Sequence, residues 1–138
     1  MEALKARPTC NAVAHVHSPY LTAYAYCGKD IRIKCSSSFA ILFGEKIPCI
    51  PYGEAATSHI ADGLAEALKD NDLVLLANHG VISVGRTLED AVKLIEAAEE
   101  VMKIYSYAKQ IGQTSDLSDE QLESIFEHHP GSKRNRLR

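Results

Sequence analysis

The segment that most constrains the fold of this 138-residue chain is 73–112, where two apolar strands precede one long helix. Residues 73–77 (LVLLA) form a continuous apolar run, which is typical of a strand buried on both faces. Residues 81–84 are a second strand candidate. Thr87 then predicts the N-cap of a helix whose apolar stripe starts at Leu88 and Val92 and continues at helical spacing to Gly112. Strands alternating with helices predict a layered α/β domain.

The remaining elements are shorter and continue this alternation. We expect strands at residues 11–17 and 47–51, and helices at residues 20–27, 57–69 and 118–128. Two prolines make 47–51 an edge strand or an irregular strand, because proline cannot donate to a ladder. Ser118 and Gln121 form a capping-box pattern at the start of the last helix. Residues 29–43 are ambiguous, and their Ser36-Ser37-Ser38 run is interpreted as a solvated turn or a helix cap.

Composition and charge exclude several classes of protein. The chain is 46% hydrophobic and 24% charged, as in ordinary globular domains, and its length suits one domain. No apolar run approaches the roughly 20 residues that span a bilayer, and the first residues lack the apolar core of a secretory signal. We therefore expect a cytoplasmic protein with no membrane partner.

The C-terminal residues 131–138 carry four basic and no acidic side chains, although the net charge of the chain is −3. We interpret them as a frayed, solvated basic tail on a domain of residues 1–130. No aromatic side chains interleave these cations, so we expect no nucleic-acid partner. The cysteines lack a C-x-x-C pair or zinc-ribbon spacing and are expected to be buried thiols. They are Cys10, Cys27, Cys35 and Cys49.

Three of the six histidines stand where they could bind a metal ion. His15 and His17 lie two apart in a predicted strand, so their side chains share a face. His79 follows the apolar strand directly, and Gly80 would allow a sharp turn there. Three imidazoles would leave coordination positions of a cation open for water or substrate. Taken singly, the pair could be solvent-facing and His79 structural. His59, His128 and His129 are interpreted as structural or surface side chains.

Four motifs, in order, carry a resemblance to a known family: AVAHVHSP at 12–19, IPCIPY at 47–52, LANHGV at 76–81 and GRTLEDA at 85–91. They resemble the class II aldolase/adducin family, whose enzymes include L-fuculose-phosphate aldolases and L-ribulose-5-phosphate 4-epimerases. The resemblance implies a three-layer α/β/α sandwich with a mostly antiparallel central sheet. It also implies a cyclic homotetramer with active sites between subunits. His15, His17 and His79 match the positions of the family's metal-binding histidines.

The resemblance further implies a metal-dependent aldehyde-lyase that cleaves a sugar phosphate, or a related hydroxy-carbonyl compound, by a reversible aldol reaction. Zn²⁺, or alternatively Mn²⁺ or Co²⁺, would stabilise the enediolate as a Lewis acid. In the family, a glutamate acts as acid/base from a part of the domain that precedes the H-x-H strand. We expect that glutamate to fall before Met1, and Glu2 does not replace it. The chain would then be the C-terminal portion of an N-terminally truncated domain, without its proton-transfer group.

Two other functions stay open at this point: a catalytically inactive metal-binding remnant and an adducin-like assembly module. The presence of all three histidines argues against the module, because a scaffold needs no metal site. The sequence leaves open the exact substrate and the choice among aldolase, epimerase, dehydratase and decarboxylase. A truncated domain should also expose apolar surface or an unpaired strand edge. We therefore expect an oligomer or an association-prone protein.

Overall fold

The computed structural model describes residues 7–53 and 58–136, with only the backbone described at residues 58–62 and 136. The elements, in chain order, are β1 Ala12–Val16, α2 Pro19–Tyr26, α3 Ser37–Phe43, β2 Cys49–Ile50, α4 Ser58–Lys69, β3 Leu73–Leu76, β4 Gly80–Gly85, α5 Leu88–Ile111, α6 Asp119–His128 and α7 Lys133–Arg136. Every helix and strand predicted from the sequence is present. In the ambiguous segment, the Ser36 hydroxyl caps α3 by accepting the N–H of Phe39 at 3.1 Å. No helix in the described part of the chain is long and apolar enough to cross a membrane.

The four strands form one mixed sheet in the order β1-β4-β3-β2. β4 pairs antiparallel with both β1 and β3, whereas β2 pairs parallel with β3. The sheet is therefore mostly antiparallel, as the resemblance implied. β2 lies at an edge of the described sheet and has a neighbouring strand on one side only. The prolines on either side of β2 are tolerated there, because no second strand of the described sheet needs their missing N–H donors.

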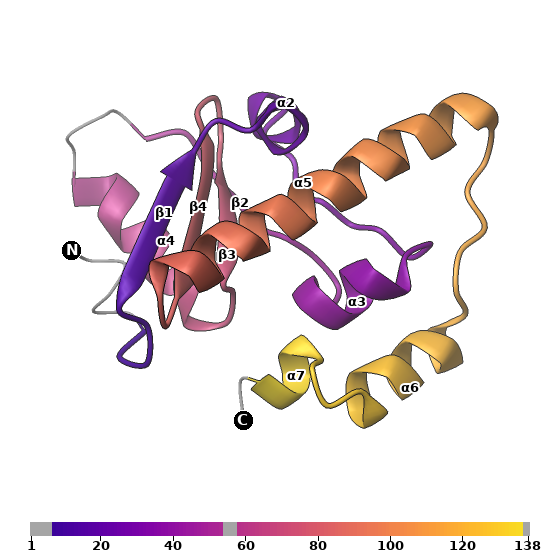
Figure 1. The fold of residues 1–138 in the computed structure, drawn as a ribbon. Helices are drawn as coiled ribbons and strands as arrows, with labels where there is room; N and C mark the ends of the chain where they lie inside the picture. The colour runs from indigo at the N-terminus through magenta and orange to yellow at the C-terminus, as the bar shows by residue number, and fades with distance from the viewer. Residues whose placement is uncertain (1–6, 54–57, 137–138) are drawn as a thin grey trace.

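Helices cover both faces of the sheet, and each face has its own core (Figure 1). On one face, Ala14, Leu75 and Val81 of the sheet pack against α2, α3 and α5. On the other face, the core joins strands and α4 through Val74, Leu76, Val84, Leu64 and Leu68. Figure 1 shows α5 crossing the first of these faces. The fold is thus a three-layer α/β/α arrangement.

The long helix α5 begins at the N-cap that the sequence predicted at Thr87, which forms a capping box with Asp90. The Thr87 hydroxyl accepts the Asp90 N–H at 3.1 Å, and the Asp90 carboxylate accepts the Thr87 N–H at 3.1 Å. The predicted apolar stripe is wrong in its first turns, because Leu88 and Val92 are 59% and 38% exposed. Ala91 faces inward instead and continues the buried row of Ile95, Ala98 and Met102.

The expectation of a frayed C-terminal tail is wrong for residues 131–136. Ser132 is fully buried, and its hydroxyl donates to the Phe126 carbonyl at 2.9 Å. α7 follows directly, and the Arg134 guanidinium pairs with Glu123. The segment is ordered because its polar groups find partners on α6. The domain boundary after residue 130 stays a prediction.

The expectation of four buried thiols is correct only for Cys10. Cys27 is exposed because it stands at the C-cap of α2, where the chain turns through Gly28 into a surface connection. Cys35 and Cys49 are half-buried. Of the four cysteines, only Cys10 is therefore a buried residue of the core.

Candidate metal centre

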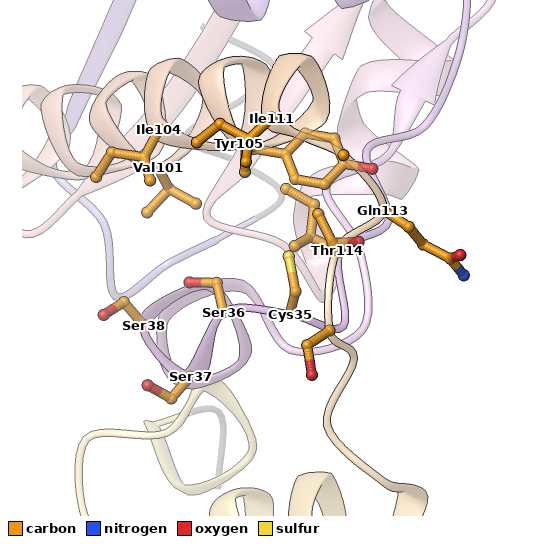
Figure 2. A pocket seen from close by; sticks show the side chains of 14 residues that line it. Cys35, Ser36, Ser37, Ser38, Val101, Ile104, Tyr105, Ile111, Gln113 and Thr114 are labelled. Carbon is orange, nitrogen blue, oxygen red and sulfur yellow. The ribbon is translucent and has the colours of Figure 1, made fainter.

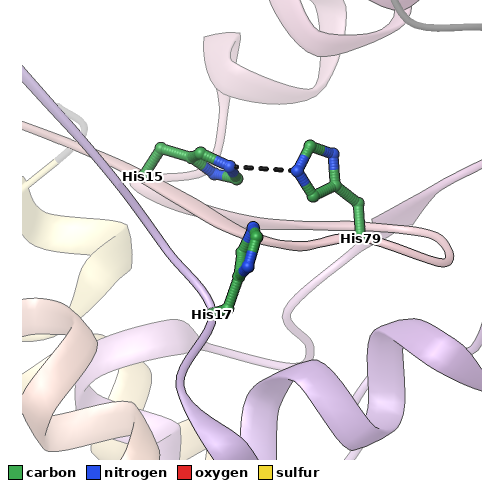
Figure 3. A group of neighbouring side chains, drawn as sticks. All are labelled: His15, His17 and His79. Atoms are coloured by element: carbon green, nitrogen blue, oxygen red, sulfur yellow. Dashed lines mark hydrogen bonds between the residues drawn. The ribbon is translucent and has the colours of Figure 1, made fainter.

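Three imidazoles lie together at one end of the sheet (Figure 3). His15 is on β1, His17 directly follows β1, and His79 is in the turn between β3 and β4. One ligand nitrogen from each ring lies within 4.8 Å of the others, and all three side chains are exposed. The ring centroids are 4.8 to 5.1 Å apart. The imidazoles are thus close enough for one small cation and accessible from solvent.

The register of β1 and β4 explains why distant histidines meet. Val16 pairs with Val81, so His17 lies opposite Gly80, one step further along the two strands. The turn before β4 places His79 at the same end of the sheet. Within this turn Asn78 has a φ of 61°, a left-handed conformation that asparagine tolerates better than most residues. Its N–H donates to the Ala25 carbonyl at 2.8 Å, which holds the turn against α2.

Gly80 is required by close packing rather than by the turn that we expected it to permit. A Cβ atom at this position would lie 2.6 Å from His17 Cδ2 and 2.6 Å from the Val16 carbonyl oxygen. Both distances are far below van der Waals contact, and one of them involves backbone. The left-handed residue of the turn is Asn78, and Gly80 instead gives room for the ring of His17.

The hydrogen bonds of His15 suit a metal ligand. Its Nδ1 lies 3.0 Å from the Val81 carbonyl oxygen, which can only accept, so we assign the proton to Nδ1. In the neutral ring, Nε2 then carries the free lone pair, as in many metal-bound histidines. This Nε2 lies 3.3 Å from Nε2 of His79. Two nitrogens on a tetrahedral zinc ion, with bonds of about 2.0–2.1 Å, are about 3.3–3.4 Å apart. The separation of the His15 and His79 nitrogens therefore fits two ligands of one divalent cation, with His17 as the third imidazole of the group.

The charge state of the site also favours coordination. Partial desolvation, and then the neighbouring His15 and His17, hold the pKa of His79 below its usual value. The neutral imidazole is the form that binds a metal. All three groups are imidazoles, which are neutral when they bind a metal. They would not offset the positive charge of a bound cation, which would stay available to attract further ligands.

A cavity of about 380 Å³ adjoins His15 and His79. Its walls are largely apolar, with Ile50, Leu76 and Ile82 from three strands. A larger cavity of about 760 Å³ lies between the end of α5 and the start of α3 (Figure 2). The described lining of this second cavity contains no histidine, carboxylate or basic side chain. The cavity beside the imidazoles is therefore the one where a metal-bound substrate could lie.

Other residues singled out in the sequence lie away from the imidazoles or outside the description. His128 and His129 are exposed, as expected, and His128 Nδ1 lies 3.0 Å from the Ser124 carbonyl. The side chain of His59, and Glu2, lie outside the described residues. Sequence reasoning missed Glu99, whose carboxylate accepts two N–H groups of α2. No local motif signals this contact.

A mixed sheet between two helical layers, with three imidazoles beside a cavity, defines an α/β protein with a candidate metal centre. Residues 1–106 match the family model described as Class II Aldolase and Adducin N-terminal domain. The chain belongs to this family, as its four sequence motifs indicated.

Individual relatives agree with this assignment. The chain is 32% identical over 126 residues to a 5-deoxy-D-ribulose 1-phosphate aldolase of Bacillus thuringiensis, covering 91% of this chain and 58% of the relative. It is 35% identical over 100 residues to a 3-oxo-tetronate 4-phosphate decarboxylase of Escherichia coli, covering 70% and 47%. A solved L-fuculose 1-phosphate aldolase superposes with a TM-score of 0.72 at 29% identity, covering 84% of this chain and 54% of that structure. The chain thus spans between about half and three fifths of the length of these relatives.

Proposed function

We propose that this chain carries the metal centre of a class II aldolase-type enzyme, a lyase that cleaves a sugar phosphate or a related hydroxy-carbonyl compound by a reversible aldol reaction. The observation that carries the proposal is the convergence of His15, His17 and His79, with a cavity lined by His15 and His79 beside them. The relatives support the reaction class, since they include an aldolase and a decarboxylase of phosphorylated substrates. Both names describe the breaking of a carbon–carbon bond.

In this proposal, His15, His17 and His79 hold a divalent cation, Zn²⁺ or alternatively Mn²⁺ or Co²⁺. When bound, the cation supplies a Lewis acid for the negative charge that develops on substrate oxygens as the bond breaks. The Val81 carbonyl orients His15 by accepting its Nδ1 proton. Proton transfer is assigned to a carboxylate outside the three ligands, typically contributing 10²–10⁴-fold.

The proposal extends to the oligomeric state, the cellular compartment and the domain organisation of the protein. We infer a cytoplasmic homotetramer, in which a domain of residues 1–130 precedes a basic segment of residues 131–138. Exposed apolar side chains on the C-terminal half of α5 support an oligomer, because such surface is usually covered. They are Ile104, Tyr107 and Ile111.

The activity is tested with 5-deoxy-D-ribulose 1-phosphate and L-fuculose 1-phosphate as substrates. We expect only slow release of dihydroxyacetone phosphate in the presence of Zn²⁺, Mn²⁺ or Co²⁺, because the family's acid/base glutamate has no match in this sequence. We expect none after chelation or in a His79→Ala variant. A His128→Ala variant serves as the control, because this histidine is exposed on α6. Metal binding without any cleavage would contradict the proposal of an enzyme and would favour the alternative of an inactive metal-binding remnant. A protein that neither bound a metal nor cleaved these substrates would contradict both the enzyme and the metal-binding remnant.

A further inference from the structure

Helix α2 begins two residues after His17, and no neighbour in sequence caps its first turn. Ser18 occupies the N-cap position, but its hydroxyl makes no capping hydrogen bond. Pro19 follows as the first helical residue and has no N–H to satisfy. The next two N–H groups, of Tyr20 and Leu21, are those that an N-cap side chain normally accepts. The start of α2 therefore needs acceptors from elsewhere in the chain.

Glu99 of α5 supplies these acceptors. Its Oε1 accepts the Tyr20 N–H at 2.8 Å, and its Oε2 accepts the Leu21 N–H at 3.0 Å. Both bonds are partly buried and charge-assisted, and a carboxylate at a helix N-terminus is further favoured by the helix dipole. A hydrogen bond with Tyr107, also on α5, raises the pKa of the Tyr20 hydroxyl. The first turn of α2 is thus fixed to α5 through two of its backbone N–H groups.

We propose that Glu99 is a positioning residue for the imidazole group, a role that rests on the proposed metal centre. Only Ser18 and Pro19 separate His17 from the turn that Glu99 holds. Proline fixes its own φ and restricts the residue before it, and Ser18 is extended with φ −70° and ψ 140°. The position of the α2 turn is therefore transmitted to the backbone of His17.

The ring of His17 is confined from its other side by Gly80. The backbone anchor and this close contact together leave the ring little freedom to turn away from His15 and His79. His15 is fixed independently, within β1 and through its bond to Val81. Loss of Glu99 should consequently affect His17 more than His15.

The test compares Glu99→Gln with two matched variants. Glu99→Gln keeps the size of the side chain but turns an amide NH₂ toward one of the two N–H donors. Glu100→Gln makes the same charge change on an exposed position of α5. Phe126→Leu weakens the separate α3–α6 core and controls for a general loss of stability. Zn²⁺ affinity is measured by competition with a chromophoric chelator, and urea unfolding ranks the stabilities.

We expect Glu99→Gln to weaken Zn²⁺ binding at least fivefold, with Glu100→Gln and Phe126→Leu within twofold of the wild type. In the metal-free protein, NMR should show faster hydrogen exchange at the Tyr20 and Leu21 amides and shifted imidazole signals of His17. The signals of His128 should not change.

Wild-type Zn²⁺ affinity in Glu99→Gln would overturn the proposal, as would unchanged His17 signals. An equal loss of affinity in Phe126→Leu would attribute the effect to stability and overturn it as well. A wild-type protein that binds no Zn²⁺ would refute the proposed metal centre. The metal-free NMR comparison would then still decide the role of Glu99.

Discussion

At the scale of single residues, Gly80 links the packing of the strand pair to the imidazole group. A methyl group there would stand 2.6 Å from both the His17 ring and the Val16 carbonyl. We predict that Gly80→Ala lowers the unfolding free energy by about 1–3 kcal/mol and weakens Zn²⁺ binding at least tenfold, because His17 must move. Urea unfolding and chelator competition measure the two effects.

Gly63 in α4 provides the matched control. A Cβ at Gly63 meets nothing within 4 Å, and alanine is the better helix former. Gly63→Ala should therefore raise the unfolding free energy by about 0.5–1 kcal/mol and leave Zn²⁺ binding unchanged. A Gly80→Ala protein that matched the wild type in stability and affinity would show that the described contact does not constrain His17.

At the scale of elements, Asp30 ties the connection after α2 to the edge strand β2. Its carboxylate accepts the Cys49 N–H at 2.8 Å and the Lys46 ammonium at 3.0 Å. Burial opposes ionisation of Asp30, but these hydrogen bonds, with the charges of Lys46 and Arg32, outweigh it and hold the pKa of Asp30 below its usual value of 3.8. The ionised carboxylate therefore stabilises the fold.

The sign of this shift sets a pH dependence. A carboxyl whose pKa is lower in the folded state contributes its full stability above the unfolded pKa and loses it as pH falls further. We predict that Asp30→Asn lowers the unfolding free energy by about 1–2 kcal/mol at pH 7, and that the difference shrinks below about pH 3.8. Urea unfolding at several pH values measures it, with exposed Asp70→Asn as the control. A difference that grew on acidification would contradict the assignment.

The elements also show what local sequence can predict. The capping boxes at Thr87 and Ser118 each lie within four residues, so their helices could be placed from the sequence. The cap of α2 could not be predicted, because Glu99 lies 78 residues from Leu21 and no spacing rule links them. Leu88 was misplaced for a related reason, since the packing of the sheet decides which side of α5 faces inward.

The imidazole group was predictable in its members but not in its detail. The H-x-H spacing put His15 and His17 on one face, and the place of His79 directly after the apolar strand made it a third candidate. The family resemblance then joined all three. The orienting bond to Val81 and the close packing of Gly80 depend on the register of β1 and β4, which the sequence alone does not specify.

At the scale of the whole molecule, α5 leaves apolar side chains exposed near its C-terminal end. Ile104 is 58% exposed, Tyr107 51% and Ile111 90%. We predict that the protein self-associates and that Ile111→Ser shifts it toward smaller species, because burial of such surface favours association. Light scattering across a concentration series measures this, with Leu88→Ser at the opposite end of α5 as the control. A monodisperse wild-type monomer would contradict the prediction.

The central claim is that His15, His17 and His79 bind one metal ion per chain. Isothermal titration calorimetry of Zn²⁺ into the metal-free protein tests it most directly. We predict one site per chain, a loss of affinity of at least a hundredfold in His15→Ala, His17→Ala and His79→Ala, and wild-type affinity in His128→Ala. Absence of a site, or Zn²⁺ binding that survives all three substitutions, would contradict the account.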